Sequence, residues 1–546
     1  MSETWRVNLP FVGSPSSMTT MNSVADFKEA LGQVSLTSWL KFSAGLYLVY
    51  HIVRAIYLLN FHPYAKYPGP KWAALSNTWY MYQWFKGRYP WSIEAALKKY
   101  GDVVRIAPNE IVFFTVQAQN DILLSGTKGK PAFRKSSFYF KIGPHTGLAA
   151  ESDPEKHRTI RKWMAPAFSP RALKEQDPVL HGVVDKAINK MAQKGDTPEG
   201  MDLTIWSDWI ACDLAGSLGY GYDFGNIENE KDADLLRWFN AVTVWVTMDQ
   251  AFKRLGPFVH PLVYLILPRS LVKLLRKHKK IVANRVENAK DFKQRDYFTS
   301  FIQEGKSMPN TNMDWILAQA NHIFIGGLDP DTNLFWSAIL FLAQHPDKFR
   351  KFAAEIRGKF KRYEDIEDEE LTHLPWLSGV IDESLRLHTN GSFGQPRVSP
   401  GATVDGHYIP KGCGVQTSIF AAFHSERYWH KPHDFCPERW LPATHSDYDP
   451  AFAKDVRECF RPFSAGTRSC IGQNMGYRQA RILFAKMAWK LDWEVVNPHE
   501  FHWERDLRLY ATWVRPHPRI RYKLSDVAKA AAAEGGRENE EKLVEV

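Results

Sequence analysis

Apolar and polar residues recur with different periods along the chain, and these periods predict a mainly helical protein. From about 155 to 360, apolar residues recur every three to four positions, as on amphipathic helices joined by short loops. Within that region, 314–345 is apolar over most of its length and predicts one long helix. Another helix is predicted at 473–490. Strand-like alternation is found over 99–114, 400–420 and 491–524. The fold class expected is mainly α with small β-sheets.

One apolar segment precedes all of these elements. It is an 18-residue run from Phe42 to Leu59, interrupted by His51 and Arg54. This length is at the short end for a transmembrane helix, and a buried or interfacial helix is the alternative. Basic residues follow the run before any acidic one, so the positive-inside rule leaves the bulk of the chain in the cytosol. We predict a single-pass membrane anchor at 36–60.

Composition sets the remaining boundaries. Residues 1–35 are polar and rich in Ser and Thr, without a clear structural pattern. The sequence at 67–70, Tyr-Pro-Gly-Pro, forms a stiff hinge that cannot continue the anchor helix. We assign 61–524 to one large domain. The tail at 525–546 is rich in Ala, Glu and Lys without a core pattern, and is expected to be disordered.

Charge and cysteine content exclude several classes of protein. The 546 residues carry a formal net charge of +10, but the basic residues form no tract or patch, so nucleic acid is not an expected partner. A basic docking face for an acidic protein or for anionic lipid fits better. The five cysteines include no CxxC pair, which argues against a disulfide framework and a zinc ribbon. Aromatic residues, at 14%, suit a large apolar pocket or a membrane-seated surface.

The most informative stretch is 463–472, FSAGTRSCIG, which places a single cysteine in a glycine-punctuated loop before a predicted helix. Gly466 and Gly472 allow a tight, left-handed backbone, so that amide N–H groups can point at the Cys470 sulfur. Arg468 adds a positive charge. These features favour a thiolate, which is the form that binds a soft metal.

This loop resembles the haem-thiolate loop of the cytochrome P-450 superfamily. The resemblance covers about 63–520 and implies the P-450 fold, with haem b as cofactor and Cys470 as the axial ligand of its iron. It implies further haem contacts in the same loop and two basic groups one helical turn apart that bind a propionate. These haem-binding residues are Phe463, Gly466, Arg468, Gly472, His157, Arg161 and Arg397.

Two other motifs follow the family order. Glu383 and Arg386 lie three apart on a predicted helix, and Arg439 lies in a Pro-Glu-Arg-Trp element before the Cys loop. In the family, this Glu and these Arg residues form a buried structural network. The resemblance also places substrate-pocket walls at 132–148, 238–250, 392–398 and 510–513. Arg457, Arg461 and Arg478 flank the Cys loop and are expected to form the docking face for a reductase.

The oxygen-activating side departs from the family. The resemblance places this function at Gly326, Gly327, Asp329 and Pro330. Pro330 occupies the position of the family's proton-relay threonine, and its missing N–H leaves the Gly326 carbonyl without a helical partner. A local bulge that makes Asp331 and Thr332 the acid and alcohol is the alternative. His322, one turn before Gly326, is either a substrate contact or a satisfied core histidine.

The resemblance is strongest to fungal microsomal members of secondary-metabolite pathways. It implies a monooxygenase of the endoplasmic reticulum membrane with a cytosolic catalytic domain. The enzyme would oxidise a lipophilic small molecule with O2 and electrons from NADPH, delivered by NADPH-cytochrome P-450 reductase. Two alternatives remain: a haem-thiolate enzyme with non-hydroxylating chemistry such as desaturation, rearrangement or dehydration, and a membrane-tethered haem-binding protein without turnover.

Overall fold

The structure is a computed structural model, and it describes residues 35–127, 129, 131–139, 145–266, 269–289, 296–302 and 313–534. The chain divides into two compact units, residues 1–67 and 68–546. The predicted polar segment at 1–35 lies outside the described residues except for Ser35.

The described part of the first unit is helical. Helix α2 (Leu36–Ile56) begins at an N-cap, where the Ser35 hydroxyl accepts a hydrogen bond from the Ser38 N–H at 3.2 Å. It continues into the π-helical turn η1 (Tyr57–Phe61). Together they form a 26-residue helix with a mean hydropathy of 1.5 and few buried residues, long and apolar enough to cross a membrane. This helix coincides with the predicted anchor at 36–60.

The second unit contains most of the helices, and two long ones match their predictions. Helix α15 spans Met313–Gln344, and α20 spans Gln473–Lys490. The other α-helices are α3 (Lys71–Leu75), α4 (Thr78–Phe85), α5 (Tyr89–Tyr100), α6 (Val116–Leu123), α7 (Pro154–Met164), α8 (Pro170–Glu175), α9 (Asp177–Lys194), α10 (Leu203–Tyr220), α11 (Asn226–Asn229), α12 (Asp234–Lys253), α13 (Arg269–Glu287), α14 (Tyr297–Ile302), α16 (Pro346–Lys359), α17 (Asp368–Leu371), α18 (Pro375–Leu387), α19 (Ile419–Phe423) and α21 (Trp503–Asp506).

Small sheets account for the strand predictions. The strands are β1 (Val103–Ala107), β2 (Glu110–Phe113), β3 (Arg134–Lys135), β4 (Met201–Asp202), β5 (Arg397–Val398), β6 (Ala402–Val404), β7 (His407–Ile409), β8 (Gly414–Thr417), β9 (Leu491–Val495), β10 (Arg508–Leu509), β11 (Trp513–Val514) and β12 (Arg519–Leu524). The largest sheet has the order β1-β2-β8-β5-β3. It brings β3 and β5 together although they are far apart in the chain, and it pairs Lys135 with Arg397.

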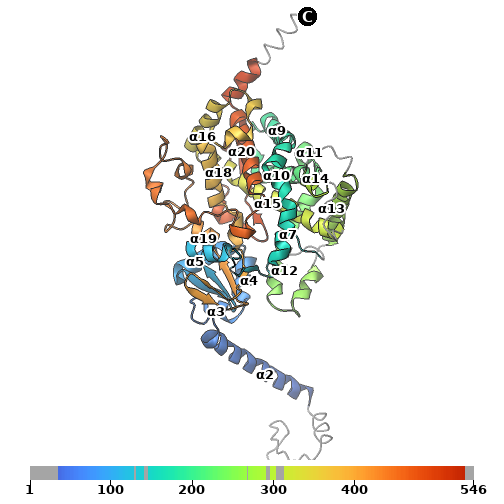
Figure 1. The fold of residues 1–546 in the computed structure, drawn as a ribbon, viewed down its shortest axis with the longest axis vertical. Coiled ribbons are helices and arrows are strands. Elements are labelled where there is room, and N and C mark those ends of the chain that lie inside the picture. The colour runs from blue at the N-terminus through green and yellow to red at the C-terminus, as the bar shows by residue number, and fades with distance from the viewer. Residues whose placement is uncertain are drawn as a thin grey trace, which may run out of the picture. The chain divides into compact units, whose positions relative to one another are not determined.

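Helix α15 lies at the centre of the helical part. Figure 1 shows α10, α15, α18 and α20 gathered side by side, and these helices contact one another through α15. Because α10 packs along α15 and is surrounded by other helices, all of its residues except Ile205 are buried. The sheet that contains β1 and β2 lies beside α3, α4 and α5.

The described part of the predicted disordered tail is ordered. Ser525 is fully buried, and its hydroxyl donates a hydrogen bond to the Trp489 carbonyl at 2.6 Å. The same hydroxyl accepts the Ala528 N–H at 3.1 Å and so begins a helical segment at 526–534. Residues 535–546 lie outside the described residues.

A buried ion network holds the segment before the Cys loop against α18. Both carboxylate oxygens of Glu383 accept hydrogen bonds at 2.9 Å from the Arg386 guanidinium, and one accepts a third from Arg439 at 3.1 Å. The N–H of Cys436 and the indole of Trp440 also donate to Glu383, each at 2.9 Å. Three of these side chains, those of Glu383, Arg386 and Arg439, have no exposed surface. The predicted network is therefore present.

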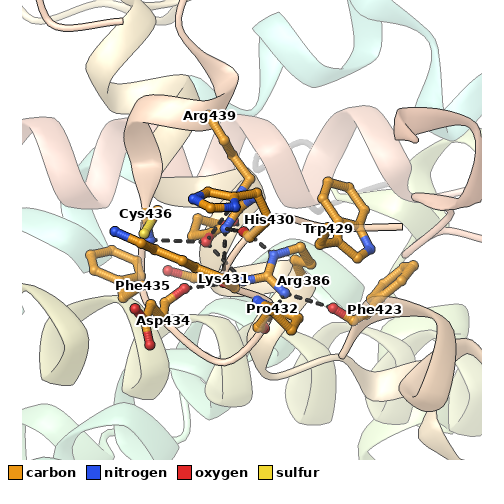
Figure 2. A network of polar contacts seen from close by, with 12 residues as sticks. Arg386, Phe423, Trp429, His430, Lys431, Pro432, Asp434, Phe435, Cys436 and Arg439 are labelled. Atoms are coloured by element: carbon orange, nitrogen blue, oxygen red, sulfur yellow. Dashed lines mark hydrogen bonds and ion pairs between the residues drawn. The ribbon is translucent and has the colours of Figure 1, made fainter. Parts of the chain in front are cut away.

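The guanidinium groups also bind backbone. Figure 2 shows Arg386 among the carbonyls of the segment before Cys436, with bonds to Phe423 and Pro432 at 2.6 Å. Arg439 forms a second ion pair with the buried Asp455 at 2.5 Å. Burial alone raises the pKa of Glu383, but Arg386 and Arg439 lower it to about 2. Two buried carboxylates thus balance two buried guanidiniums.

We expect Glu383→Gln to lower the free energy of unfolding by about 3–5 kcal/mol, because it leaves two buried guanidiniums with one carboxylate. The pKa of Glu383 is depressed, so its contribution is full above the unfolded value near 4.5 and is lost as the pH falls toward about 2. Denaturant unfolding of both proteins from pH 7 to pH 3 measures this, and the difference between them shrinks as the pH falls.

Asp382→Asn is the matched control on the same helix. Burial raises the pKa of Asp382 to about 6, and its carboxylate accepts one hydrogen bond, from Tyr477 at 2.7 Å. An asparagine oxygen can accept the same bond, so the loss is below about 1 kcal/mol. Equal losses in the two variants would contradict the special role of Glu383.

Candidate active site

The loop before α20 carries Cys470 and is fixed by its own backbone. The Cys470 N–H donates a hydrogen bond to the Phe463 carbonyl at 2.9 Å, which closes the loop. Gly466 has a φ of 72°, and a methyl group in its place would lie 2.4 Å from the Leu123 carbonyl oxygen. Only glycine fits at this position. Gly472 has a φ of −90°, so the predicted left-handed conformation is wrong for this second glycine.

All five cysteines are free thiols, and Cys470 alone has an exposed side chain. Many protein atoms nevertheless lie around its sulfur. Burial raises the pKa of the Cys470 thiol, while the Gly472 N–H and the Arg161 guanidinium lower it. The cation that favours the thiolate is therefore Arg161, whereas the sequence predicted Arg468. The net direction is upward, so a thiolate here needs the further positive charge of a metal.

Five basic side chains meet beside this loop. His157 and Arg161 come from α7, Lys135 and Arg397 from the paired strands β3 and β5, and Arg468 from the Cys loop. Burial, followed by the four surrounding cations, lowers the pKa of His157 to about 3, so its imidazole is neutral. Lys135 was missed by sequence reasoning, because only the pairing of β3 with β5 brings it to this position.

These cations outnumber the carboxylates around them. Arg161 donates to the Ser469 carbonyl at 2.5 Å, and Arg468 donates to the Glu151 carbonyl at 2.5 Å. The buried Arg397 has no partner for its Nε. Burial holds the pKa of Lys135 well below its usual range, and the neighbouring Arg397 and Arg468 add to this effect. A half-buried cluster of like charges is destabilised, and an anion beside it relieves the repulsion.

These residues fit the haem that the resemblance implies. The two carboxylates of a porphyrin would offset the surplus positive charge, and the free Nε of Arg397 would gain an acceptor. The accessible Cys470 sulfur would gain an iron atom. The ring of Phe463 packs on Tyr477 of α20 with centroids 5.1 Å apart, and so supports the loop from the side of the protein core.

On α15, the two predicted glycines have different surroundings. The helix passes through Pro330 without a break. Gly326 is exposed, and an added methyl group would meet nothing within 4 Å, so this residue borders open space. Because Pro330 lacks an N–H, the Gly326 carbonyl has no donor four residues on. Gly327 is buried, and an added methyl group there would contact Ala215 of α10 at 3.5 Å.

Asp329 is held by a polar network behind the helix. The Asn333 amide donates to the Asp329 carboxylate at 3.1 Å and to its carbonyl at 2.8 Å. The Arg515 guanidinium donates to the side-chain oxygen of Asn333 at 3.2 Å and to the Asp208 carboxylate at 2.6 Å. Burial raises the pKa of Asp329 to about 6, although Arg515 and the Asn333 bond lower it. Its carboxyl can therefore hold or release a proton near neutral pH.

The alternative pair, Asp331 and Thr332, does not reach this space. Both side chains are buried, with exposed fractions of 5% and 2%, and no bulge interrupts the helix. A methyl group added at Gly476 of α20 would lie 3.9 Å from the Asp331 carboxylate, so this side chain faces α20. Burial raises its pKa well above the usual range. Re-registration of the acid and alcohol is therefore excluded.

A cavity of about 630 Å³ adjoins α15 at His322 and Ile325, next to Gly326. Described residues from all four predicted wall segments line it, and those at 140–144 lie outside the described residues. The lining side chains are mostly aromatic or aliphatic. Sequence reasoning missed Tyr80 and Trp84 of α4 and Tyr264, because only tertiary packing places them here. The lining includes Tyr80, Trp84, Phe138, Tyr139, Trp238, Phe239, Val242, Thr243, Trp245, Gln250, Tyr264, His322, Ile325, Phe393, Tyr510 and Thr512.

The three arginines expected to form a docking face are engaged within the protein. Arg478 forms ion pairs with Asp177 and Asp368, the latter at 2.8 Å, and is largely buried. Arg461 donates to Asn120 at 2.5 Å, and Arg457 donates to the backbone of the ion network. The expectation fails for Arg478, because two acidic side chains neutralise it.

Comparison with known proteins agrees with this site. The family model described as Cytochrome P-450 matches residues 68–519. The chain is 38% identical over 483 residues to cytochrome P-450 monooxygenase poxC of Penicillium oxalicum, covering 88% of this chain and 93% of that protein. It is 35% identical to cytochrome P-450 monooxygenase TwmD of Talaromyces wortmannii, covering 87% and 94%. It is 33% identical to cytochrome P-450 monooxygenase btcC of Colletotrichum orbiculare, covering 87% and 92%.

These matches extend over the fold and over every motif described above, including the Cys loop, the buried ion network and the long helix beside the cavity. The family implies a haem iron as cofactor and oxidoreductase activity of the monooxygenase type. The chain belongs to the cytochrome P-450 family.

Proposed function

We propose that this protein is a haem-thiolate monooxygenase of fungal secondary metabolism that oxidises a neutral lipophilic molecule with electrons from an NADPH-dependent reductase. The observation that carries the proposal is the accessible Cys470 sulfur beside a buried cluster of cations that outnumber their carboxylates. The fungal monooxygenases matched over most of the chain support the class of reaction and of organism.

Bound haem supplies the activation of O2 and the one-electron chemistry that protein side chains lack. Cys470 serves as the thiolate ligand and donates electron density. Arg397, Arg468 and Lys135 bind the carboxylates and fix the orientation of the ring. The aromatic walls of the cavity exclude water and hold the substrate against α15.

Proton supply falls to Asp329 and to water held by the Gly326 carbonyl, because Pro330 removes the family's hydroxyl. The Asp329 carboxyl titrates near neutral pH and is oriented by Asn333. The carbonyl that Pro330 leaves without a helical donor can accept a hydrogen bond from water. Asp329 is the acid in this proposal, and Pro330 keeps the space beside Gly326 open.

The apolar helix Leu36–Phe61 supports an anchor in the endoplasmic reticulum membrane with the catalytic domain in the cytosol. For the reductase, α7 offers a docking surface in place of Arg478. Its inner face reaches the Cys loop through Arg161, while Lys156, Arg158 and Lys162 are exposed on its outer face. An acidic flavoprotein surface would be attracted to these residues.

Pro330 also favours a second candidate, a haem-thiolate enzyme that desaturates, rearranges or dehydrates its substrate. Without the relay hydroxyl, a substrate oxygen can take part in proton transfer. Product analysis under labelled O2 distinguishes the two reactions, because only hydroxylation places the label in the product. NADPH consumption that depends on substrate separates both from haem binding without turnover.

We expect the reduced, carbon-monoxide-treated protein to show the red-shifted Soret band of thiolate ligation. Cys470→Ser abolishes this band, and Cys413→Ser, at another free cysteine, retains it. Absorbance difference spectra of the three proteins measure this. A wild-type spectrum without the shifted band would overturn the proposed function.

Lys135→Met is expected to weaken haem binding but to stabilise the haem-free protein. The variant loses one charge-assisted contact, so haem binding weakens about tenfold. The haem-free variant becomes more stable to heat, since a buried cation beside Arg397 and Arg468 is removed. Haem titration and thermal unfolding measure the two effects. Lys156→Met, on the exposed surface of α7, changes neither haem affinity nor thermal stability. If Lys135→Met also left both unchanged, the cation cluster would have no role in haem binding.

Substitutions on α15 test the proton supply. Asp329→Asn lowers substrate turnover about 10²-fold, because it removes a positioned acid. Pro330→Thr leaves haem binding intact and changes the fraction of NADPH electrons that reach product. Asp331→Asn, two residues from Asp329, leaves this fraction unchanged because its carboxyl faces α20. Unchanged coupling and product ratio in the Pro330 variant would contradict the assignment.

A further inference from the structure

The described residues that line the cavity beside α15 carry no charge. Among the described residues that line it, none is Asp, Glu, Lys or Arg, and its one histidine is His322. Two of its hydroxyl groups satisfy each other, because Thr243 and Thr512 share a hydrogen bond at 2.8 Å. The Thr247 hydroxyl donates to the Thr243 carbonyl at 3.0 Å, and the buried Tyr80 hydroxyl has no partner. These residues therefore offer a ligand no ionic partner, and its polar groups must match their remaining donors and acceptors.

His322 presents a fixed donor. Its Nδ1 accepts the Ala149 N–H at 3.1 Å, so the proton of a neutral ring is on Nε2. Burial lowers the pKa of His322 to about 4, which keeps the ring neutral. A methyl group at Gly147 would lie 2.2 Å from Nδ1, so the loop can approach the ring only with glycine there. Gln319 accepts the Leu148 N–H at 3.0 Å and holds the same loop.

Gln250, on α12, presents a fixed acceptor. Its Nε2 donates to Asp249 at 3.0 Å, which places Oε1 away from that carboxylate. Asp249 is fully buried and is bound by Lys253 at 2.7 Å and His260 at 2.9 Å, so a reversed amide would set two acceptors against each other. Gln250 is 9% exposed and lines the cavity, and its Oε1 is buried without a partner. The indole N–H of Trp238, on the same helix, is also unpartnered.

A buried amide oxygen without a partner carries a free-energy penalty that a ligand hydroxyl removes. We propose that the substrate is a neutral, largely apolar molecule with an oxygen acceptor that binds His322 Nε2 and a hydroxyl that donates to Gln250 Oε1. This proposal rests on the proposed function and adds the substrate class: a hydroxylated ketone, ester or ether on a hydrocarbon skeleton. His322 and Gln250 are specificity-determining residues on two separate helices, α15 and α12.

Two matched sets of probes test the proposal on the haem-loaded, full-length protein. The first comprises 5α-androstane, its 3-ketone, its 17β-alcohol and the 3-keto-17β-alcohol; the second is the corresponding set on the smaller trans-decalin skeleton. Dissociation constants are measured by equilibrium dialysis, which does not depend on turnover. Each set separates the keto group from the hydroxyl group on a constant apolar skeleton.

In at least one set, the keto-alcohol binds most tightly. His322→Phe weakens the keto members about 5- to 10-fold and leaves the others within about twofold, since one hydrogen bond is lost. His322→Gln restores much of the difference through its amide N–H. Gln250→Leu acts in the same way on the hydroxyl members. The controls are His278→Phe and Gln479→Leu, which alter a buried histidine and a buried glutamine outside this cavity.

The proposal is overturned if, in both sets, the dissociation constants do not depend on the keto or the hydroxyl group. It is also overturned if a variant weakens the binding of all four members equally. Failure of every probe to bind the wild-type protein also overturns it, because a neutral apolar cavity of this size admits at least the smaller skeleton. Absence of the thiolate Soret band in the wild-type protein, in contrast, overturns the proposed function. This band is measured without any probe, so the two failures can be distinguished.

Discussion

The carboxylate of Glu383, held between two guanidinium groups, is the interaction on which the haem-binding half of the molecule depends. It joins α18 to the segment that runs through Cys436 and Arg439, and that segment leads into the Cys loop. Asp455 completes the balance of charge. A network of this kind is costly to desolvate but has few alternative arrangements, and it therefore specifies one position for the backbone that precedes Cys470.

Around Cys470, in contrast, the charges are not balanced. Here the basic side chains come from four parts of the chain, and the carboxylates nearby do not balance them. The fold tolerates this because the surrounding ion pairs, sheets and helices fix the backbone positions of Lys135, Arg161 and Arg397. The protein thus uses a neutral network for rigidity and an unbalanced one for affinity, within a single domain.

Local patterns could be predicted from the sequence, and long-range partners could not. The loop around Cys470, the bounds of α20 and the buried acid of α18 all depend on residues a few positions apart. Lys135 joins the cation cluster only through β3 and β5, whose residues lie more than 250 positions apart in the chain. Arg478 is unavailable for docking because it pairs with Asp177, which lies about 300 positions earlier in the chain. The φ of Gly472 likewise depends on how α20 begins, which composition does not reveal.

The backbone of Ala149 touches both functional regions. Its N–H donates to His322 in the cavity proposed for the substrate, and its carbonyl accepts the Lys135 ammonium group at 2.5 Å in the cation cluster. A lineage that acquires a new substrate by replacing His322 also releases the loop that positions Lys135, and so loosens its hold on the cofactor. Replacements on α12 have no such link. Substitutions that change substrate preference are therefore less constrained at α12 than at α15 in this protein.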